Sequence, residues 1–121
     1  MMQPNPSSLT ARVTFPNPEK IKSELKKLAK EVIDNEPNIL AIYLFGSRVK
    51  GNFSARSDGD LLIIIEQDDN RPIDRISHYL ELFLKASIPV DVFPFTKKEA
   101  ENNPFAQRAL QEGVLLCSKE L

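Results

Sequence analysis

Two short apolar runs on either side of a polar segment restrict the fold of this chain more than any other feature. The first run, ILAIYLF at residues 39–45, ends at Gly46; it is too short for a typical helix and is rich in strand-forming residues. The second run extends from Asp60 to Ile65 and is almost entirely aliphatic. We therefore predict two central strands of a sheet, and the short polar connection between them is compatible with an antiparallel pair.

Helical patterns precede and follow these two strands. Asn17 and Pro18 are typical of a helix start, and apolar residues then recur at helical spacing until the chain reaches Pro37. The turn at residues 66–70 carries several acids that we expect to be solvated. Pro72 then opens a second helix. The predicted buried stripe of that helix consists of Ile73, Ile76, Leu80, Phe83 and Leu84.

A third strand and a structural tail complete the predicted domain. Residues 88–95 read as the strand, and Thr96 with Glu99 matches a capping box for a short helix. Gly113 is placed to end a further helix, and residues 114–116 are suited to a short last strand. This order predicts an α/β fold with a small mixed sheet of three or four strands. The helix between the second and third strands is long enough for a parallel crossover.

Asp58 and Asp60 stand two residues apart at the start of the second strand. Side chains at this spacing point to the same face of a strand, so their like charges repel unless a cation lies between them. A hard divalent ion such as Mg²⁺ is the natural occupant of such a site. The turn at Gly46–Ser47 offers backbone N–H groups to a phosphate, and Arg48 adds a cation. A metal beside phosphate-binding groups indicates nucleotide chemistry.

Asp91 is a charged residue at the centre of the third apolar strand. Strand alternation places Val90 and Val92 on one face and Asp91 on the other, together with Phe93. A carboxylate among such neighbours is costly unless it is paired, hydrogen-bonded or bound to a metal. An edge-strand aspartate that faces water is the alternative. Because an Asp-x-Asp strand precedes it, we favour Asp91 as a third metal ligand.

The composition limits the size and the partners of the protein. A chain of 121 residues is one domain by size, and we predict a flexible arm at residues 1–16 and a single domain at residues 17–121. A formal net charge of −1 argues against general nucleic-acid binding. One cysteine, with no signal peptide and no long apolar span, predicts a cytoplasmic protein that is not in a membrane.

The spacing of the turn and the aspartates resembles the signature of the nucleotidyltransferase superfamily related to DNA polymerase beta. In that signature Gly-Ser is followed by ten residues and then by Asp-x-Asp, and Gly46–Ser47, Asp58 and Asp60 meet it. Arg48 after the serine and Ser57 before the first aspartate agree as well. The small size of the chain points within this superfamily to the minimal nucleotidyltransferases.

The resemblance implies a fold and a set of site residues. It implies a nucleotidyltransferase fold with helices on one side of the sheet, and ATP or another nucleoside triphosphate as the donor. It assigns catalysis and Mg²⁺ binding to Asp58, Asp60 and Asp91. It assigns nucleotide binding to Gly46, Ser47, Arg48 and Ser57. The chain departs from the family at Gly59, where an apolar residue is common and where glycine loosens the start of the strand.

Three functions are open at this point. Minimal nucleotidyltransferases often act as antitoxins by attaching AMP to a tyrosine of a HEPN toxin, so the resemblance implies such a partner. The first alternative is an antitoxin that masks its partner by binding alone. The second is transfer to a hydroxyl of a small molecule. The sequence does not choose a base, a number of metals or an oligomeric state, and a homo-oligomer stays possible.

Overall fold

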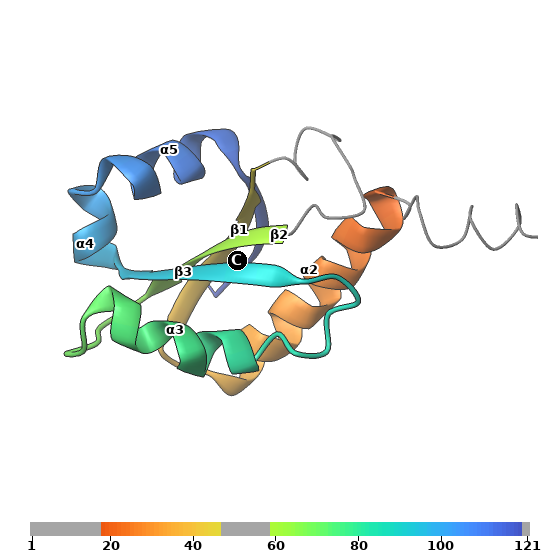
Figure 1. Cartoon of the computed structure of the whole chain (residues 1–121), viewed down its shortest axis with the longest axis horizontal. Coiled ribbons are helices and arrows are strands. Elements are labelled where there is room, and N and C mark those ends of the chain that lie inside the picture. Colours follow the sequence, from red (N-terminus) through yellow and green to blue (C-terminus); the bar gives the residue numbers. More distant parts are fainter. Residues whose placement is uncertain (1–17, 47–58, 120–121) are drawn as a thin grey trace, which may run out of the picture.

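The computed structural model describes residues 18–46 and 59–119 (Figure 1). The arm predicted at residues 1–16 lies outside the described residues. The α/β class is confirmed, and so are the predicted limits of the first strand at residues 39–45. In chain order the elements are α2 (Pro18–Asn35), β1 (Ile39–Phe45), β2 (Gly59–Ile65), α3 (Pro72–Glu81), β3 (Val90–Thr96), α4 (Lys97–Glu101), α5 (Pro104–Glu112) and β4 (Val114–Ser118).

The four strands form one mixed sheet in the order β3-β2-β1-β4. β1 pairs antiparallel with both β2 and β4, whereas β2 and β3 are parallel. The predicted antiparallel first pair and the parallel crossover through α3 are therefore both confirmed. As a consequence, the end of β1 and the starts of β2 and β3 meet at one edge of the sheet.

Helices cover both faces of this sheet, and here the structure differs from the expectation of helices on one side. Figure 1 shows α2 and α3 on one side of the strands and the shorter α4 and α5 on the other. The reason lies in β2, where Leu61 to Ile65 are all buried. Leu61, Ile63 and Ile65 belong to the core that includes α2, and Leu62 and Ile64 pack with alanines of α4 and α5. A strand that is apolar on both sides needs cover on both.

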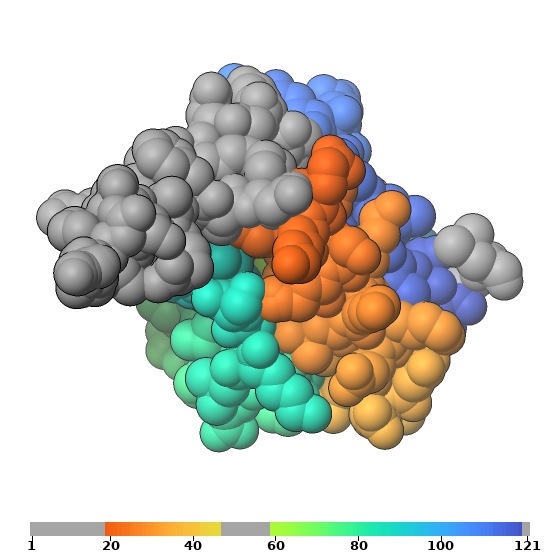
Figure 2. Space-filling model, turned by 90° about the vertical axis from the view of Figure 1, so that its right-hand side faces the viewer, coloured from red at the N-terminus to blue at the C-terminus, as the bar shows by residue number. Residues whose placement is uncertain are grey.

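The helix α2 covers the sheet with the apolar stripe that its spacing predicts. Its buried residues are Ile21, Leu25, Leu28, Ala29, Val32 and Ile33. Figure 2 shows α2 in orange between the segment that follows α3, in teal, and the C-terminal residues, in blue. Glu24 joins α2 to the first of these segments, since Ser87 donates its backbone N–H and its hydroxyl to that carboxylate at 3.1 and 2.6 Å.

The predicted buried stripe of α3 is confirmed at three positions and wrong at two. Phe83 is buried, and Ile76 and Leu80 pack against the core. Ile73 is 69% exposed and Leu84 is 73% exposed, whereas the helix buries Arg75 and Tyr79. Ile73 comes two residues before Arg75, and at about 100° per residue it points to the opposite side of the helix. Leu84 lies beyond the end of the helix at Glu81. The sequence pattern thus predicted burial for Ile73 and Leu84 and missed the burial of Arg75.

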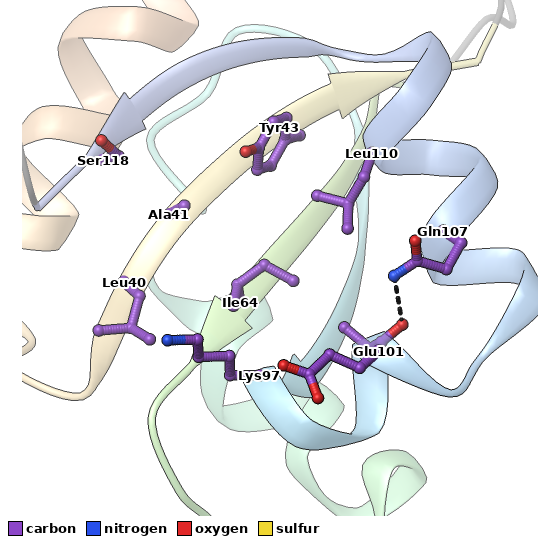
Figure 3. Close-up of a pocket in the computed structure, with 10 residues that line it drawn as sticks. Leu40, Ala41, Tyr43, Ile64, Lys97, Glu101, Gln107, Leu110 and Ser118 are labelled. Atoms are coloured by element: carbon purple, nitrogen blue, oxygen red, sulfur yellow. Dashed lines mark hydrogen bonds between the residues drawn. The ribbon is translucent and has the colours of Figure 1, made fainter.

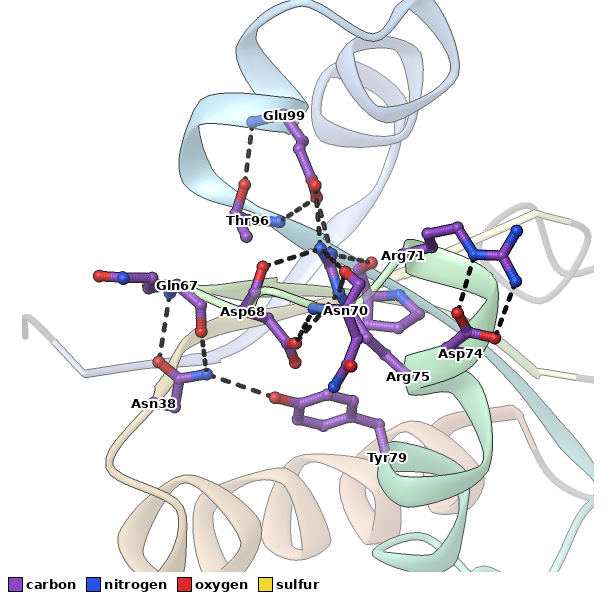
Figure 4. Close-up of polar contacts among 11 residues, drawn as sticks. Asn38, Gln67, Asp68, Asn70, Arg71, Asp74, Arg75, Tyr79, Thr96 and Glu99 are labelled. Atoms are coloured by element: carbon purple, nitrogen blue, oxygen red, sulfur yellow. Dashed lines mark hydrogen bonds and ion pairs between the residues drawn. The ribbon is translucent and has the colours of Figure 1, made fainter.

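Arg75 is the centre of a polar network at the far end of the sheet (Figure 4). Its side chain is 1% exposed, and its guanidinium donates to the two carboxylate oxygens of Glu99 at 2.7 and 2.9 Å. It also donates to the carbonyls of Asn70 at 2.9 Å and Pro94 at 3.3 Å, and lies 3.7 Å from the Asp68 carboxylate. The hydrogen bond from Arg75 is the main reason that the pKa of Glu99 is lowered to about 2.

This network corrects the prediction of a fully solvated acidic turn after β2. Glu66 and Asp69 are exposed as expected, but Asp68 is half-buried because it faces Arg75. Glu99 also completes the predicted capping box, accepting from the backbone N–H of Thr96 at 2.9 Å. One arginine therefore holds together the turn after β2, the helix α3 and the start of α4.

The C-terminal elements close the second face of the sheet. The helix α5 ends at Gly113, as predicted, and β4 then pairs with β1. A Cβ atom at Gly113 would lie 2.9 Å from the carbonyl oxygen of Leu44, so the glycine allows α5 to turn closely over β1. Across residues 18–46 and 59–119, every helix is too short or too polar to cross a membrane.

Candidate active site

Three strand ends bring the described site residues together at one edge of the sheet. Phe45 of β1 lies opposite Asp60 of β2, and Asp60 lies opposite Asp91 of β3. Neighbouring strands are about 4.8 Å apart, and residues in register project to the same face. The carboxylates of Asp60 and Asp91 therefore start from adjacent positions on one face. We call Phe45, Asp60 and Asp91 the acid row.

The acid row lies on the face of the sheet that α4 and α5 cover. Along β2, Leu62 packs against these helices, and strand alternation gives Asp60 the same face. Along β3, Val92 belongs to the core on the opposite face, whereas Phe93 packs on the same face as Leu62. This alternation confirms that Asp91 points to the side away from Val92. Asp91 is exposed and Asp60 is half-buried, so the acid row opens to solvent.

The geometry of the acid row agrees with both interpretations of Asp91, as a water-facing residue and as a metal ligand. β3 is an edge strand and Asp91 is exposed, as the water-facing alternative requires. Its partner in register, however, is a second aspartate. Two carboxylates that start from adjacent positions on one face supply the oxygen ligands that a hard divalent cation prefers. The donor chemistry of this pair therefore fits Mg²⁺.

Gly46 brings the end of β1 directly against Asp60. Its backbone has φ of +90°, a conformation that favours glycine, and it is the one glycine with positive φ in the described residues. A Cβ atom at this position would overlap Oδ2 of Asp60 and would lie 3.4 Å from its Cγ. Any other residue would therefore push the carboxylate away. The predicted turn and the predicted aspartate are neighbours in space.

The remaining predicted site residues lie outside the described residues. These are Ser47, Arg48, Ser57 and Asp58. Among residues 18–46 and 59–119, no group of three histidine, cysteine, aspartate or glutamate side chains is placed to hold a metal ion. Asp60 and Asp91 supply two carboxylates, and the predicted third, Asp58, belongs to the segment that the structure does not describe.

An aromatic cluster that the sequence analysis did not single out borders the acid row. It consists of Phe45, Phe93, Phe95 and Phe105. The ring centroids of Phe45 and Phe93 are 5.6 Å apart, and the Phe105 ring lies 5.5 Å from Phe45 and 5.1 Å from Phe93. Two members carried a signal in the sequence, because Phe45 is the last residue before Gly46 and Phe93 follows Asp91 by two positions. The helical spacing of Phe105 with Ala109 and Leu110 predicts only an inner stripe of α5, and it does not point to this place, which α5 reaches through the tertiary fold.

A groove lies farther along the same face, between the sheet and the two short helices (Figure 3). It has a volume of about 390 Å³, an apolar floor that includes Tyr43, Ile64 and Leu110, and charged groups from Lys97 and Glu101. Tyr43 and Leu62 are in register one step beyond Phe45 and Asp60. The groove is therefore separate from the acid row, although both open on the same side of the sheet.

Comparison with known proteins identifies the class to which this fold and site belong. Residues 19–120 match the family described as "Polymerase beta, Nucleotidyltransferase". The chain belongs to this family and is a nucleotidyltransferase. It is similar to the protein of Methanocaldococcus jannaschii named "Putative protein adenylyltransferase MJ1379", with 31% identity over 98 residues that cover 77% of this chain and 94% of the relative.

Solved structures with low sequence identity share the fold. A "putative nucleotidyltransferase" from Sulfolobus solfataricus superimposes with a TM-score of 0.63 at 22% identity, covering 85% of each chain. A variant of the toxin–antitoxin MntA-HpeT gives a TM-score of 0.54 at 21% identity, covering 82% of this chain and 74% of the other. A toxin–antitoxin structure with AMP-PNP gives 0.52 at 19% identity, covering 78% and 74%. These likenesses confirm the nucleotidyltransferase fold.

Proposed function

We propose that this nucleotidyltransferase moves AMP from ATP to a tyrosine hydroxyl of a HEPN-type toxin and thereby acts as its antitoxin. The observation that carries the proposal is the acid row, in which Asp60 and Asp91 are in register and Gly46 lies against Asp60. This arrangement supports a site in which paired carboxylates lie beside a turn that would bind the phosphates of the donor. The 31% identical relative, whose name specifies a protein adenylyltransferase, supports a protein as the acceptor.

The residues of the site divide into two groups by the part of the donor that they contact. Asp58, Asp60 and Asp91 would hold Mg²⁺, which when bound neutralises charge on the phosphates at the point of transfer. Gly46, Ser47, Arg48 and Ser57 would hold the triphosphate through backbone N–H groups, hydroxyls and the guanidinium. Asp91 either completes the metal site or accepts the proton of the incoming hydroxyl.

The transfer is an in-line displacement at the α-phosphorus of ATP. The tyrosine oxygen forms a bond to that phosphorus as its proton passes to a base. The bond from the α-phosphorus to the bridging oxygen breaks, and pyrophosphate leaves with the electron pair. The toxin gains one AMP group, and its modified tyrosine no longer has a free hydroxyl.

The identity of the acceptor is supported by two fold neighbours and by the signature. Two fold neighbours come from toxin–antitoxin structures, and one of them contains AMP-PNP, which is a nucleotide of the donor's type. The HEPN class of the toxin rests on the resemblance of the signature alone. A binding-only antitoxin is disfavoured, because a module that only masks its partner has no use for two carboxylates held in register.

Intact-mass spectrometry tests the proposal directly. The protein encoded by the neighbouring gene, as the candidate toxin, is co-expressed and incubated with this protein, Mg²⁺ and ATP, and the same reaction is run with the Asp58→Asn/Asp60→Asn variant. We expect the toxin to gain the mass of one or more AMP groups with the wild type and none with the variant. A stable complex without any mass gain would instead indicate a binding-only antitoxin, and neither gain nor complex would direct the search to small-molecule acceptors.

A further inference from the structure

The face of the sheet that α4 and α5 cover is ordered in three rows that run across β1, β2 and β3. The first is the acid row. The second consists of Tyr43, Leu62 and Phe93, and the third of Ala41, Ile64 and Phe95, as the register of the two strand pairs shows. Successive rows are about 7 Å apart, because residues of one face recur every second position of a strand. The surface thus changes from acidic to aromatic within one step.

Phe105 lies over these rows and joins them. Its ring is 5.5 Å from that of Phe45 in the first row, 5.1 Å from that of Phe93 in the second and 6.3 Å from that of Phe95 in the third. Three ring contacts hold it from below, yet Phe105 is 44% exposed. An apolar ring that is fixed by its neighbours and still open to solvent, beside two carboxylates, is placed to contact a substrate.

We infer that Phe105 forms a stacking surface for the base of the donor nucleotide. The inference rests on the proposed function, which places the phosphates of the donor at the acid row and at Gly46. The sugar then carries the base away from the phosphates, and the Phe105 ring is an exposed planar group that adjoins the row. A nucleobase stacks on a phenyl ring through its π-face, and a ring that is already ordered loses little entropy on contact.

The chemistry of the aromatic cluster also predicts how selective this contact is. Its four members are phenylalanines, which offer no hydrogen-bond donor or acceptor to the edge of a base. Stacking of this kind is tolerant of the base, because every base has a π-face. Phe105 should therefore strengthen the binding of ATP and GTP to similar degrees.

Calorimetric titration with ATP, GTP and inorganic tripolyphosphate, each with Mg²⁺, separates base binding from phosphate binding. In Phe105→Leu, which keeps apolar packing without an aromatic ring, we expect the Kd for ATP and for GTP to rise about tenfold, within the range for loss of one base–aromatic contact. The Kd for tripolyphosphate should not change. Phe105→Trp should restore tight nucleotide binding. Ile73→Ala, an exposed apolar residue on the other face of the sheet, serves as the matched control and should change none of the three constants.

The other outcomes are distinct from one another. Unchanged ATP binding in Phe105→Leu overturns the inference, including the case in which only the complex with the toxin weakens. An equal loss of ATP and tripolyphosphate binding also overturns it, because the residue would then support the acid row and not the base. If the wild type binds tripolyphosphate but ATP no better, base stacking is absent while the phosphate site stands. If the wild type binds neither, the proposed function itself is wrong.

Discussion

The two ends of the sheet use carboxylates in opposite ways. At the far end, Glu99 and Asp68 face Arg75, whose side chain is 1% exposed and donates to both oxygens of Glu99. At the acid row, Asp60 and Asp91 face each other in register on adjacent strands. A built-in cation makes the first arrangement part of the structure. The second gathers two carboxylates at adjacent positions, and paired carboxylates are the oxygen ligands that a divalent cation such as Mg²⁺ prefers.

The largest expected effect comes from removing charge at the acid row. Asp58→Asn/Asp60→Asn should abolish AMP transfer, because amides hold a divalent cation much less tightly than carboxylates do. The variant should melt at nearly the same temperature as the wild type, because asparagine keeps the size and shape of the aspartate side chain. Mass spectrometry of the acceptor and thermal unfolding measure the two effects. Transfer that persists in the variant would show that these aspartates do not hold the metal.

Removing the guanidinium of Arg75 at the far end of the sheet should instead lower stability and leave activity unchanged. Arg75→Met leaves Glu99 and Asp68 without their counter-charge and several carbonyls without a donor. We expect the free energy of unfolding to fall by about 3 kcal/mol, the low end for breaking a buried pair, because Glu99 is partly open to water. The specific activity of the folded fraction should stay unchanged. Urea denaturation measures the loss.

A surface ion pair provides the control for Arg75. Arg71 donates to Asp74 at 2.9 Å, but its side chain is 79% exposed. Exposed pairs contribute about 0–1 kcal/mol, so Arg71→Ala should change the free energy of unfolding by at most about 1 kcal/mol. If the two arginine variants were equally stable, the network around Arg75 would not be the structural element that its burial indicates.

The contrast between the two ends of the sheet also explains which elements and site residues could be predicted from the sequence. The strand at residues 39–45 was predicted with its observed limits, because a short, continuous apolar run bounded by glycine has few other readings. Asp60 and Asp91 were found as candidates because charge is conspicuous in apolar strands. Their register was not predictable, since it depends on the parallel pairing that α3 brings about.

Arg75 and Phe105 were missed for a related physical reason. An arginine within an amphipathic pattern reads as a solvent-facing residue, and the partner that makes its burial favourable, Glu99, is 24 positions away. Phe105 reads as part of an inner helical stripe, and only the packing of α5 over the acid row leaves it half-open. Pattern analysis detects periodic burial, whereas both of these residues depend on partners distant in the sequence.

A smaller effect is expected at Gly46, where backbone and site meet. Gly46→Ala forces a side chain into φ of +90° and into the space of the Asp60 carboxylate. The conformation alone costs about 1–2 kcal/mol. In an Asp60→Ala background the carboxylate is gone, so the cost should fall to that conformational part. Chemical denaturation of the two single variants and the double variant gives the coupling energy. No coupling would mean that Gly46 and Asp60 are not in contact.

The smallest effect concerns the dependence of stability on pH, and it comes from the carboxyl group of Glu99. Because Arg75 lowers the pKa of Glu99 from 4.5 to about 2, the folded protein favours the charged form of this carboxyl more than the unfolded chain does. Its stabilising contribution is complete above the unfolded pKa and is lost as the pH falls from about 5 towards 2. Glu99→Gln should therefore be less stable than the wild type at neutral pH, and the difference should shrink in acid.

Thermal unfolding of the wild type and of Glu99→Gln between pH 3 and 7 measures this difference. A stability difference that stays constant over this range would contradict the prediction, because it would mean that the contact with Arg75 does not favour the charged form of Glu99 in the folded protein.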